Sequence, residues 1–244
     1  MSFDEAVRRA GVELLRDEPL AKHTTFRIGG PAEWFAVAAT LEQLETLAEA
    51  ALEHGVPLTV LGGGSNLLIS DAGVRGLVVA NQTRWHGPGA RFREQLQHSA
   101  LHADHWVAES GVMLAGMART TTRNGLAGLE WAISIPGTVA GAVIGNAGAH
   151  GSDTAAGLAW VLVRYPGCGR QVLTRDDLHY TYRSSRLREQ LLDPSEEKRP
   201  VILAAGFDLA QGDPAALVHR ADENLARRRA SQPVEPSAGS IFRN

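Results

Sequence analysis

The chain has 244 residues, of which 44% are hydrophobic and 21% charged, and its formal net charge is −3. These values are typical of a globular protein with one large domain or two smaller ones, and they lack the basic excess of most nucleic-acid-binding proteins. The one cysteine, Cys168, excludes an internal disulfide framework and a two-cysteine metal motif.

The N-terminal part of the sequence predicts a small α/β unit over residues 1–80. Its first twenty residues form an amphipathic pattern of mixed charge, without the apolar core of a signal peptide. Thr40 and Gln43 are spaced as a capping box, and leucines and alanines recur after them on one helical face. In chain order, the expected elements are a helix at Glu5–Leu15, strands at His23–Ile28 and Trp34–Ala38, a helix from Leu41 to before Gly55, and strands at Leu58–Leu61 and Leu77–Val79.

A second unit is expected over residues 81–210, beginning with a polar segment of strands and loops. Asp213 and Pro214 have the residue types of an N-cap and a first helical position, so they predict a last helix that runs to about Arg229. The expected elements between these segments are a helix at Leu114–Asn124, a hairpin of Val161–Val163 with Gln171–Leu173 that turns around Cys168, and a strand at Val201–Ala205.

The most apolar stretch, Trp131–Gly145, does not have the pattern of a membrane helix. Its glycines have the spacing of a membrane dimer face. However, the run is shorter than the ~20 residues that a bilayer requires, and it contains Pro136. We therefore expect no membrane segment and a cytoplasmic location.

A glycine-rich loop follows the strand at Leu58–Leu61. Gly62, Gly63 and Gly64 allow close approach of the backbone to a ligand, and their N–H groups can form a nest for a phosphate or diphosphate. Ser65 and Asn66 add side-chain donors. The pattern matches neither the dinucleotide fingerprint nor the P-loop, so a plain turn remains the alternative.

A second segment of small residues runs from Ile135 to Ala149 and carries almost no charge. Such a chain can lie flat against a planar ligand and offer its main-chain groups to a heteroaromatic edge, as a flavin ring requires. A tightly packed turn without a ligand is the alternative.

Taken in order, the motifs of residues 20–244 resemble those of the MurB family, the UDP-N-acetylenolpyruvoylglucosamine reductases, in its shorter type. Each motif is modest alone, and their order makes the resemblance specific. The matching segments are His23–Gly30, Leu61–Leu68, Gly125–Glu130, Ile135–Val139, Asn146–Gly151, Tyr182–Arg186, Arg227–Pro233 and Pro236–Asn244.

This resemblance implies an α+β fold: a two-lobed FAD-binding domain like that of the vanillyl-alcohol oxidases (PCMH type), with lobes at residues 1–80 and 81–210, then the beginning of a substrate domain at 211–244. FAD would lie between the lobes. The implied reaction uses NADPH and FAD to reduce the enolpyruvyl ether of UDP-N-acetylglucosamine to UDP-N-acetylmuramate, a peptidoglycan precursor. The partner would be this nucleotide sugar, without nucleic acid or membrane, and we expect a monomer.

The resemblance also implies roles for single residues. Arg183 would stabilise the negative charge that develops on the substrate carboxylate, and Ser240 would deliver the proton. A surface arginine and a turn serine are the alternatives that the residues alone leave open. The implied FAD contacts are Leu61, Gly62, Gly63, Gly64, Ser65, Asn66, Pro136, Gly137, Thr138, Gly141, Asn146 and Gly148, and the implied substrate contacts are Arg183, Arg228, Ser240 and Asn244.

The sequence departs from the family pattern at Ala140, where a glycine is expected, and at His150, where a tyrosine or phenylalanine is usual. Members of the family continue past the motif that ends at Asn244 and carry a catalytic glutamate near the C-terminus. No residue of this sequence can be assigned to that glutamate. An inactive flavin-binding chain and another FAD oxidoreductase of the same architecture, such as an alcohol oxidase, are therefore the alternatives. His98, His102 and His105 lack accompanying acidic or cysteine ligands, so we expect no metal.

Overall fold

The computed structural model describes residues 2–92, 104–193, 199–233 and 235–239. It divides the chain into two compact units, one formed by residues 1–83 together with 234–244 and the other by residues 84–233. The predicted start of a substrate domain at residue 211 stays a prediction. Within the described ranges, no helix has both the length and the apolar character that crossing a bilayer requires.

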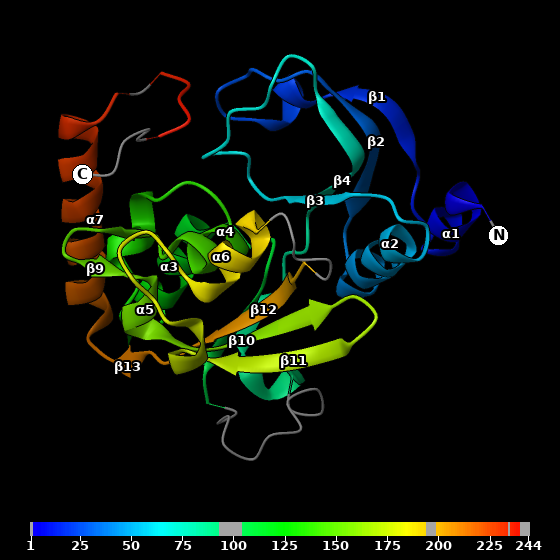
Figure 1. Cartoon of the computed structure of the whole chain (residues 1–244). Coiled ribbons are helices and arrows are strands. Elements are labelled where there is room, and N and C mark those ends of the chain that lie inside the picture. Colours follow the sequence, from blue (N-terminus) through cyan, green and yellow to red (C-terminus); the bar gives the residue numbers. More distant parts are fainter. Residues whose placement is uncertain (1, 93–103, 194–198, 234, 240–244) are drawn as a thin grey trace. The chain divides into compact units, whose positions relative to one another are not determined.

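The first unit is built on a four-stranded sheet in the order β1-β2-β4-β3 (Figure 1). Strand β4 pairs in parallel with β2 on one side and β3 on the other, while β1 pairs antiparallel with β2. The elements are α1 (Phe3–Arg9), β1 (Leu15–Pro19), the 3₁₀ turn η1 (Leu20–His23), β2 (Pro31–Ala38), α2 (Leu41–Glu53), β3 (Leu58–Leu61) and β4 (Val74–Asn81).

Helix α2 begins and ends where the sequence predicts. The Thr40 hydroxyl accepts a hydrogen bond from the Gln43 amide, and the Gln43 side chain accepts from the Thr40 amide, which completes the capping box. Gly55, with φ 62°, ends the helix in the left-handed conformation that glycine adopts easily. On the predicted apolar face of α2, Leu41, Leu44, Leu47, Ala48 and Ala51 are buried, whereas Leu52, expected on the same face, is exposed near the end of the helix.

Two N-terminal predictions were wrong. The first helix ends at Arg9 instead of Leu15, because Gly11 has φ 65° and the chain then enters β1. Residues 23–28 form no strand: the Arg27 amide donates to the Thr24 carbonyl, and Arg27 itself has φ 59°, which no extended strand allows. This segment is therefore a turn.

The second unit contains a five-stranded antiparallel sheet in the order β11-β10-β12-β6-β5. The hairpin of β10 and β11 is confirmed, and Cys168 is exposed in its turn. The strands of this sheet are β5 (His86–Pro88), β6 (Trp106–Glu109), β10 (Leu158–Tyr165), β11 (Gly169–Thr174) and β12 (Val201–Phe207). The shorter pairs are β7 (Leu126–Ala127) with β13 (Ala210–Gln211) and β8 (Gly148–Ala149) with β9 (Ser152–Asp153).

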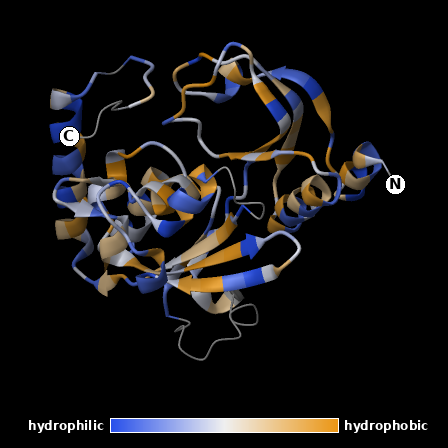
Figure 2. Cartoon of the chain, viewed as in Figure 1, coloured by the Kyte–Doolittle hydropathy of each residue, from blue (hydrophilic) through white to orange (hydrophobic). Residues whose placement is uncertain are grey.

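Helices α3, α4 and α6 gather over one face of this sheet (Figure 1). The hydrophobic colour along β10 and β12 in Figure 2 marks the strands that form the centre of this core. The helices and 3₁₀ turns are η2 (Gly89–Phe92), α3 (Leu114–Arg123), η3 (Glu130–Ser134), α4 (Val139–Gly145), α5 (Thr154–Gly157), η4 (Asp176–Leu178), α6 (Arg186–Leu192) and α7 (Pro214–Ser231).

Helix α7 is anchored to η3 through the buried Glu130. The Glu130 carboxylate accepts hydrogen bonds from the Gly128 amide at 2.8 Å and from the Arg220 guanidinium at 3.3 Å. The Asn224 side chain donates to the Glu130 carbonyl at 3.2 Å. The start of this helix is as predicted, because the Asp213 carboxylate caps the Ala216 amide and Pro214 occupies the first turn.

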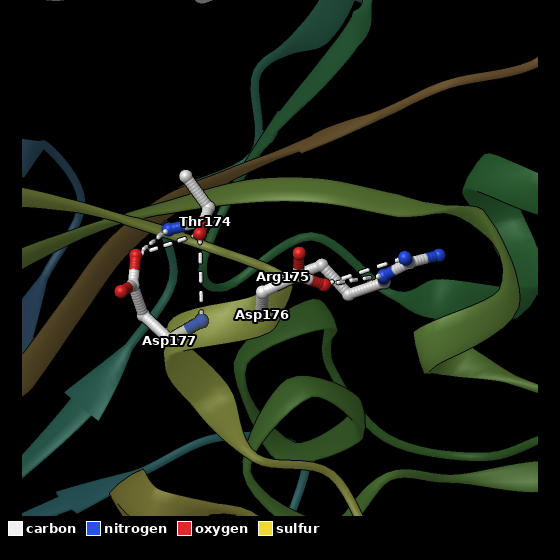
Figure 3. A network of polar contacts seen from close by, with 4 residues as sticks. All are labelled: Thr174, Arg175, Asp176 and Asp177. Carbon is white, nitrogen blue, oxygen red and sulfur yellow. Dashed lines mark hydrogen bonds and ion pairs between the residues drawn. The ribbon is translucent and has the colours of Figure 1, made fainter.

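A polar turn connects β11 to η4 (Figure 3). The Asp177 carboxylate accepts hydrogen bonds from the Thr174 hydroxyl at 2.7 Å and from the Thr174 amide at 2.8 Å. These bonds hold the pKa of Asp177 below its usual value, since they stabilise the ionised form. The turn fixes the start of the segment that carries Tyr180 and Arg183.

Candidate functional site

The small-residue segment is held in place at the start of α4. The Leu114 amide donates to the Gly137 carbonyl at 3.0 Å, and the Val139 amide donates to the Val112 carbonyl at 2.9 Å. Gly137 has φ 103°, which the backbone needs in order to turn into the helix. The buried Thr138 is the N-cap, and its hydroxyl accepts from the Gly141 amide at 3.5 Å. These hydrogen bonds hold the segment against the rest of its own unit without the help of a ligand.

The other end of α4 is capped by side chains from residues 180–185. A helix leaves its last carbonyls without partners inside the helix. Here the Tyr180 hydroxyl donates to the Val143 carbonyl at 2.9 Å, and the Ser185 hydroxyl donates to the Ile144 carbonyl at 2.7 Å. The segment around the Tyr-Arg-Ser-Ser motif therefore stabilises the end of α4, a role that the sequence did not reveal.

Tyr180 donates this bond over a wide pH range. Burial raises the pKa of its phenol well above the usual value, and the carboxylate of Asp153 adds to the increase by repelling a phenolate. The side chain is therefore neutral at physiological pH.

Asn146 uses its side chain to close the turn after α4. The residue is in the left-handed conformation, with φ 42° and ψ 59°, which asparagine tolerates better than most residues. Its amide nitrogen donates to the Asp153 carboxylate at 3.1 Å and to the Thr181 carbonyl at 3.2 Å, and its amide oxygen accepts from the Ala155 amide at 3.1 Å. This side chain is buried and organises the loop.

Arg183 lies at a pocket formed by this loop. Its guanidinium donates to the Asn146 carbonyl at 3.4 Å and to the Gly148 carbonyl at 3.1 Å, and it lies 5.4 Å from the centre of the Tyr182 ring. The pocket has a volume of about 370 Å³, within the ~300–1,000 Å³ typical of ligand sites. It is lined by Asn146, Gly148–Asp153, Ala156, Tyr182 and Arg183.

The backbone of Arg183 is also unusual. Its φ is 57°, a left-handed conformation that costs a non-glycine residue free energy and that surrounding contacts must hold in place. A guanidinium has five N–H donors in a planar fork. The two carbonyl bonds therefore orient the group while its remaining donors suit a carboxylate at the pocket.

The glycines of α4 are not required by packing within the protein. A Cβ at Gly141 would come no closer than 3.7 Å to Thr138 Oγ1, and one at Gly145 no closer than 3.8 Å to an Arg188 nitrogen. Both are ordinary contact distances, although each glycine costs the helix up to about 1 kcal/mol relative to alanine. Space kept open at such a cost fits the close approach of a flat ligand.

In the glycine loop of the first unit, packing within the protein does require one of the glycines. Gly64 is buried with φ 61°, and a Cβ there would lie 2.0 Å from the His23 carbonyl oxygen. The Thr25 amide donates to the Gly64 carbonyl at 3.0 Å. Gly62 and Gly63 are exposed and can approach a ligand. The first and second glycines thus fit the predicted diphosphate contact, whereas the third is demanded by the fold.

The remaining predicted residues are distributed as follows. Leu61 is buried at the end of β3, Ser65 is half-buried, and Pro136 is exposed. Arg228 is half-buried in the last turn of α7. The predicted residues Ser240 and Asn244, and the histidines His98 and His102, lie outside the described residues.

His105 is described and has a partner within the protein. Its Nδ1 is 3.1 Å from the indole nitrogen of Trp160. Over the part of the chain that the structure describes, no group of three or more histidine, cysteine or acidic side chains could hold a metal ion.

The chain matches a known family model. Residues 32–165, more than half of the 244 residues, match the family described as FAD binding domain. The match includes β2, the glycine loop, α4 and the loop that lines the pocket, and it ends with β10.

Individual relatives share one name. A UDP-N-acetylenolpyruvoylglucosamine reductase of Synechococcus sp. (strain WH7803) is 40% identical over 246 residues, which covers 98% of this chain and 73% of that protein. The reductase of the same name from Rubrobacter xylanophilus is 40% identical over 228 residues, covering 93% and 70%. The crystal structure of the Thermus caldophilus enzyme (MurB) matches with a TM-score of 0.71 and 28% identity, covering 96% and 74%. These matches confirm the predicted resemblance and the predicted α+β FAD-binding fold.

Proposed function

Because the chain belongs to the UDP-N-acetylenolpyruvoylglucosamine reductase family and is an FAD-dependent oxidoreductase, we propose that it reduces the enolpyruvyl ether of UDP-N-acetylglucosamine to UDP-N-acetylmuramate, with NADPH as the electron donor. The product is a peptidoglycan precursor. Both the nucleotide sugar and NADPH are cytoplasmic metabolites, so we propose the same location for the chain.

The reaction sets clear demands on the protein. When bound, FAD reduced by NADPH would supply a hydride to the β-carbon of the enolpyruvyl group. Negative charge then spreads from the α-carbon into the carboxylate, and a proton must reach the α-carbon. Fixed donors are needed for the charge, and a proton donor is needed on the correct face.

The placement of Arg183 is the observation that carries the proposal. The two carbonyls that bind the guanidinium, at 3.4 Å and 3.1 Å, hold it at the pocket, so little reorganisation is needed when charge develops. A guanidinium keeps its charge at all physiological pH values and matches a carboxylate with two parallel bonds. We assign Arg183 to the substrate carboxylate.

The FAD contacts follow from the two glycine-rich segments. We assign the isoalloxazine ring to Pro136, Gly137, Thr138, Gly141, Asn146 and Gly148, and the diphosphate to Leu61–Asn66. The open space at Gly141 and the exposed Gly62 and Gly63 support this assignment. Because the Asn146 side chain is used within its loop, the main chain of residues 146–148 is the part that we assign to the ring.

The substrate assignments extend to three further residues. We propose that Ser240 donates the proton to the α-carbon and that Arg228 and Asn244 bind the nucleotide part. Arg228 is half-buried in the last turn of α7, and its guanidinium is the kind of group that pairs with a diphosphate.

The test uses the full-length protein with FAD and separates the two half-reactions. Arg183→Met is expected to leave bleaching of the flavin by NADPH unchanged and to slow reoxidation by the enolpyruvyl sugar by ~10²–10³-fold, the effect of removing one strong transition-state donor. Arg183→Lys keeps the charge without the planar fork and should recover part of the rate. Rapid-mixing absorbance measurements report both steps.

Arg175→Met is the matched control, because Arg175 belongs to the same unit but does not line the pocket of Arg183. It should leave both half-reactions unchanged. An equal loss of both half-reactions in Arg183→Met, or no loss of either, would contradict the assignment.

A further inference from the structure

A short hairpin presents His150 at the pocket of Arg183. Strands β8 and β9 pair antiparallel with Ala149 opposite Ser152, so the two residues between them, His150 and Gly151, form the turn. The hairpin lines the same pocket as the Arg183 guanidinium. His150 therefore stands at the tip of the hairpin and at the wall of the pocket.

The backbone of this turn is poorly suited to a histidine. Both turn residues have positive φ, 53° at His150 and 81° at Gly151, the pattern of two-residue hairpin turns that favour asparagine, aspartate or glycine at the first position. Histidine adopts such angles more often than most residues, but less readily than glycine or asparagine. The histidine thus carries a free-energy cost that a smaller residue would avoid.

Packing against the protein does not explain this residue. The His150 side chain is exposed, and within the described ranges no hydrogen bond or ion pair holds it. A Cβ on the neighbouring Gly151 would have no atom within 4 Å, so the tip of the turn is open. The reason for an imidazole at this position therefore lies outside the fold.

The hairpin below the turn is nevertheless well held. A Cβ at Gly148 would lie 2.7 Å from the Ser152 carbonyl oxygen, so the two strands approach closely. The Asp153 carboxylate accepts a hydrogen bond from the Asn146 side chain at 3.1 Å, and the Gly148 carbonyl accepts from Arg183 at 3.1 Å. The guanidinium and the turn are thus attached to the same fixed element.

We infer that His150 is a further substrate-binding residue, which donates a hydrogen bond to an oxygen of the nucleotide sugar whose carboxylate Arg183 holds. An imidazole has at least one N–H donor in either protonation state, so it can make this bond with or without a charge. The strained turn is then explained by the side chain that it presents to the ligand. This inference rests on the proposed function.

His150→Gly in the full-length protein with FAD tests the inference, because it removes the imidazole and suits the positive φ. Thermal denaturation of the FAD-free protein should show a stability that is unchanged or higher. Titration of the oxidised flavin with the enolpyruvyl sugar, without NADPH, should show binding that is weaker by about 3- to 10-fold, the loss of one hydrogen bond. FAD affinity and bleaching of the flavin by NADPH should stay unchanged.

Two further variants sharpen the result. His150→Asn keeps a side-chain donor on a residue that the turn favours, so it should recover part of the sugar affinity. His179→Gly is the matched control: His179 is an exposed histidine of the same unit with φ 45°, and it lines a different pocket. This control should leave the sugar affinity unchanged.

Three results would overturn the role of His150. They are an unchanged sugar affinity in His150→Gly, an equal loss of affinity in His179→Gly, and a lower unfolding temperature of His150→Gly, which would show that the fold itself needs the imidazole. The wild type separates the two proposals. If the sugar neither binds to it nor reoxidises its reduced flavin, the proposed function fails; if the sugar does both and His150→Gly behaves alike, only the role of His150 fails.

Discussion

The two glycine-rich segments of this chain keep their small residues for different reasons. In the loop at residues 62–66, Gly64 is enforced by the protein's own backbone, since a Cβ would overlap the His23 carbonyl. In helix α4, Gly141 and Gly145 have room for a Cβ. Glycine thus reflects packing at Gly64 and open space at the two glycines of α4.

The difference separates stability from binding. Substitution of a glycine that the fold requires should lower the free energy of unfolding, with or without a ligand. Substitution of a glycine that the fold does not require should change only the affinity for the ligand. Substitutions at matched positions can therefore decide which kind each glycine is.

The largest effect is expected for Gly64→Ala. The substitution meets both a left-handed backbone and a clash at 2.0 Å, and we expect a loss of about 3 kcal/mol or more in the free energy of unfolding. Thermal or urea denaturation of the FAD-free protein measures it. Gly55→Ala is the control, because Gly55 has φ 62° with nothing within 4 Å and should cost only about 1–2 kcal/mol. Equal losses at both positions would remove the packing explanation.

A smaller effect is expected for Gly141→Ala, and it should appear in FAD affinity and not as a loss of stability. Helix propensity should keep the FAD-free protein as stable as before or raise its stability by up to about 1 kcal/mol. The added methyl group should weaken FAD binding by about tenfold or more, equivalent to roughly 1.4 kcal/mol. Fluorescence titration with FAD measures the change in affinity.

Gly116→Ala is the matched control for this change. Gly116 is the third residue of α3, as Gly141 is of α4, and its Cβ would come no closer than 3.9 Å to Met113. It should affect stability in the same direction and leave the FAD affinity alone. Unchanged FAD affinity in Gly141→Ala would show that the open space at α4 serves no ligand.

The smallest effect concerns the bond that caps α4. Tyr180→Phe should lower the free energy of unfolding by about 1 kcal/mol, because the Val143 carbonyl loses its donor. Burial raises the pKa of Tyr180, so its contribution is fully present below the ordinary tyrosine pKa of ~10 and is lost as the pH rises above it.

The pH dependence supplies the check on Tyr180. Denaturation of the wild type at increasing pH should show a loss of stability above pH ~10 that is reduced in Tyr180→Phe. Tyr182→Phe is the control for the loss of a hydroxyl at the surface, since Tyr182 is exposed, and it should leave the stability unchanged. A wild type and a Tyr180→Phe variant that lose stability equally at high pH would contradict the role of burial.

Local signals predicted the longest helices and strands, and missed shorter elements such as α4 and α6. The capping box at Thr40 and the Asp213-Pro214 pair specify helix starts through bonds within one turn, and both helices form as expected. The strand predicted at residues 23–28 failed because alternation of side chains cannot reveal the left-handed φ of Arg27. Strand β1 was missed because it is mostly exposed and carries charged residues, so no apolar pattern marks it.

The site was predictable in composition but not in its internal contacts. The glycine-rich motifs and Arg183 are visible as residue types in a recognisable order. The bonds from Tyr180 and Ser185 to the end of α4 join residues 37 and 41 positions apart, and no local spacing encodes such pairs. For the same reason, the sequence indicated Asn66 as a ligand contact and gave no sign of the hydrogen bond that its side chain donates to the Ala238 carbonyl.

The hairpin turn between β10 and β11 has a practical consequence. It carries the one cysteine of the sequence, and the residue is exposed. A maleimide dye would therefore attach to this protein at a single known place without any engineered substitution. Since bound FAD absorbs and emits visible light, energy transfer between flavin and dye would follow cofactor uptake in the unaltered chain.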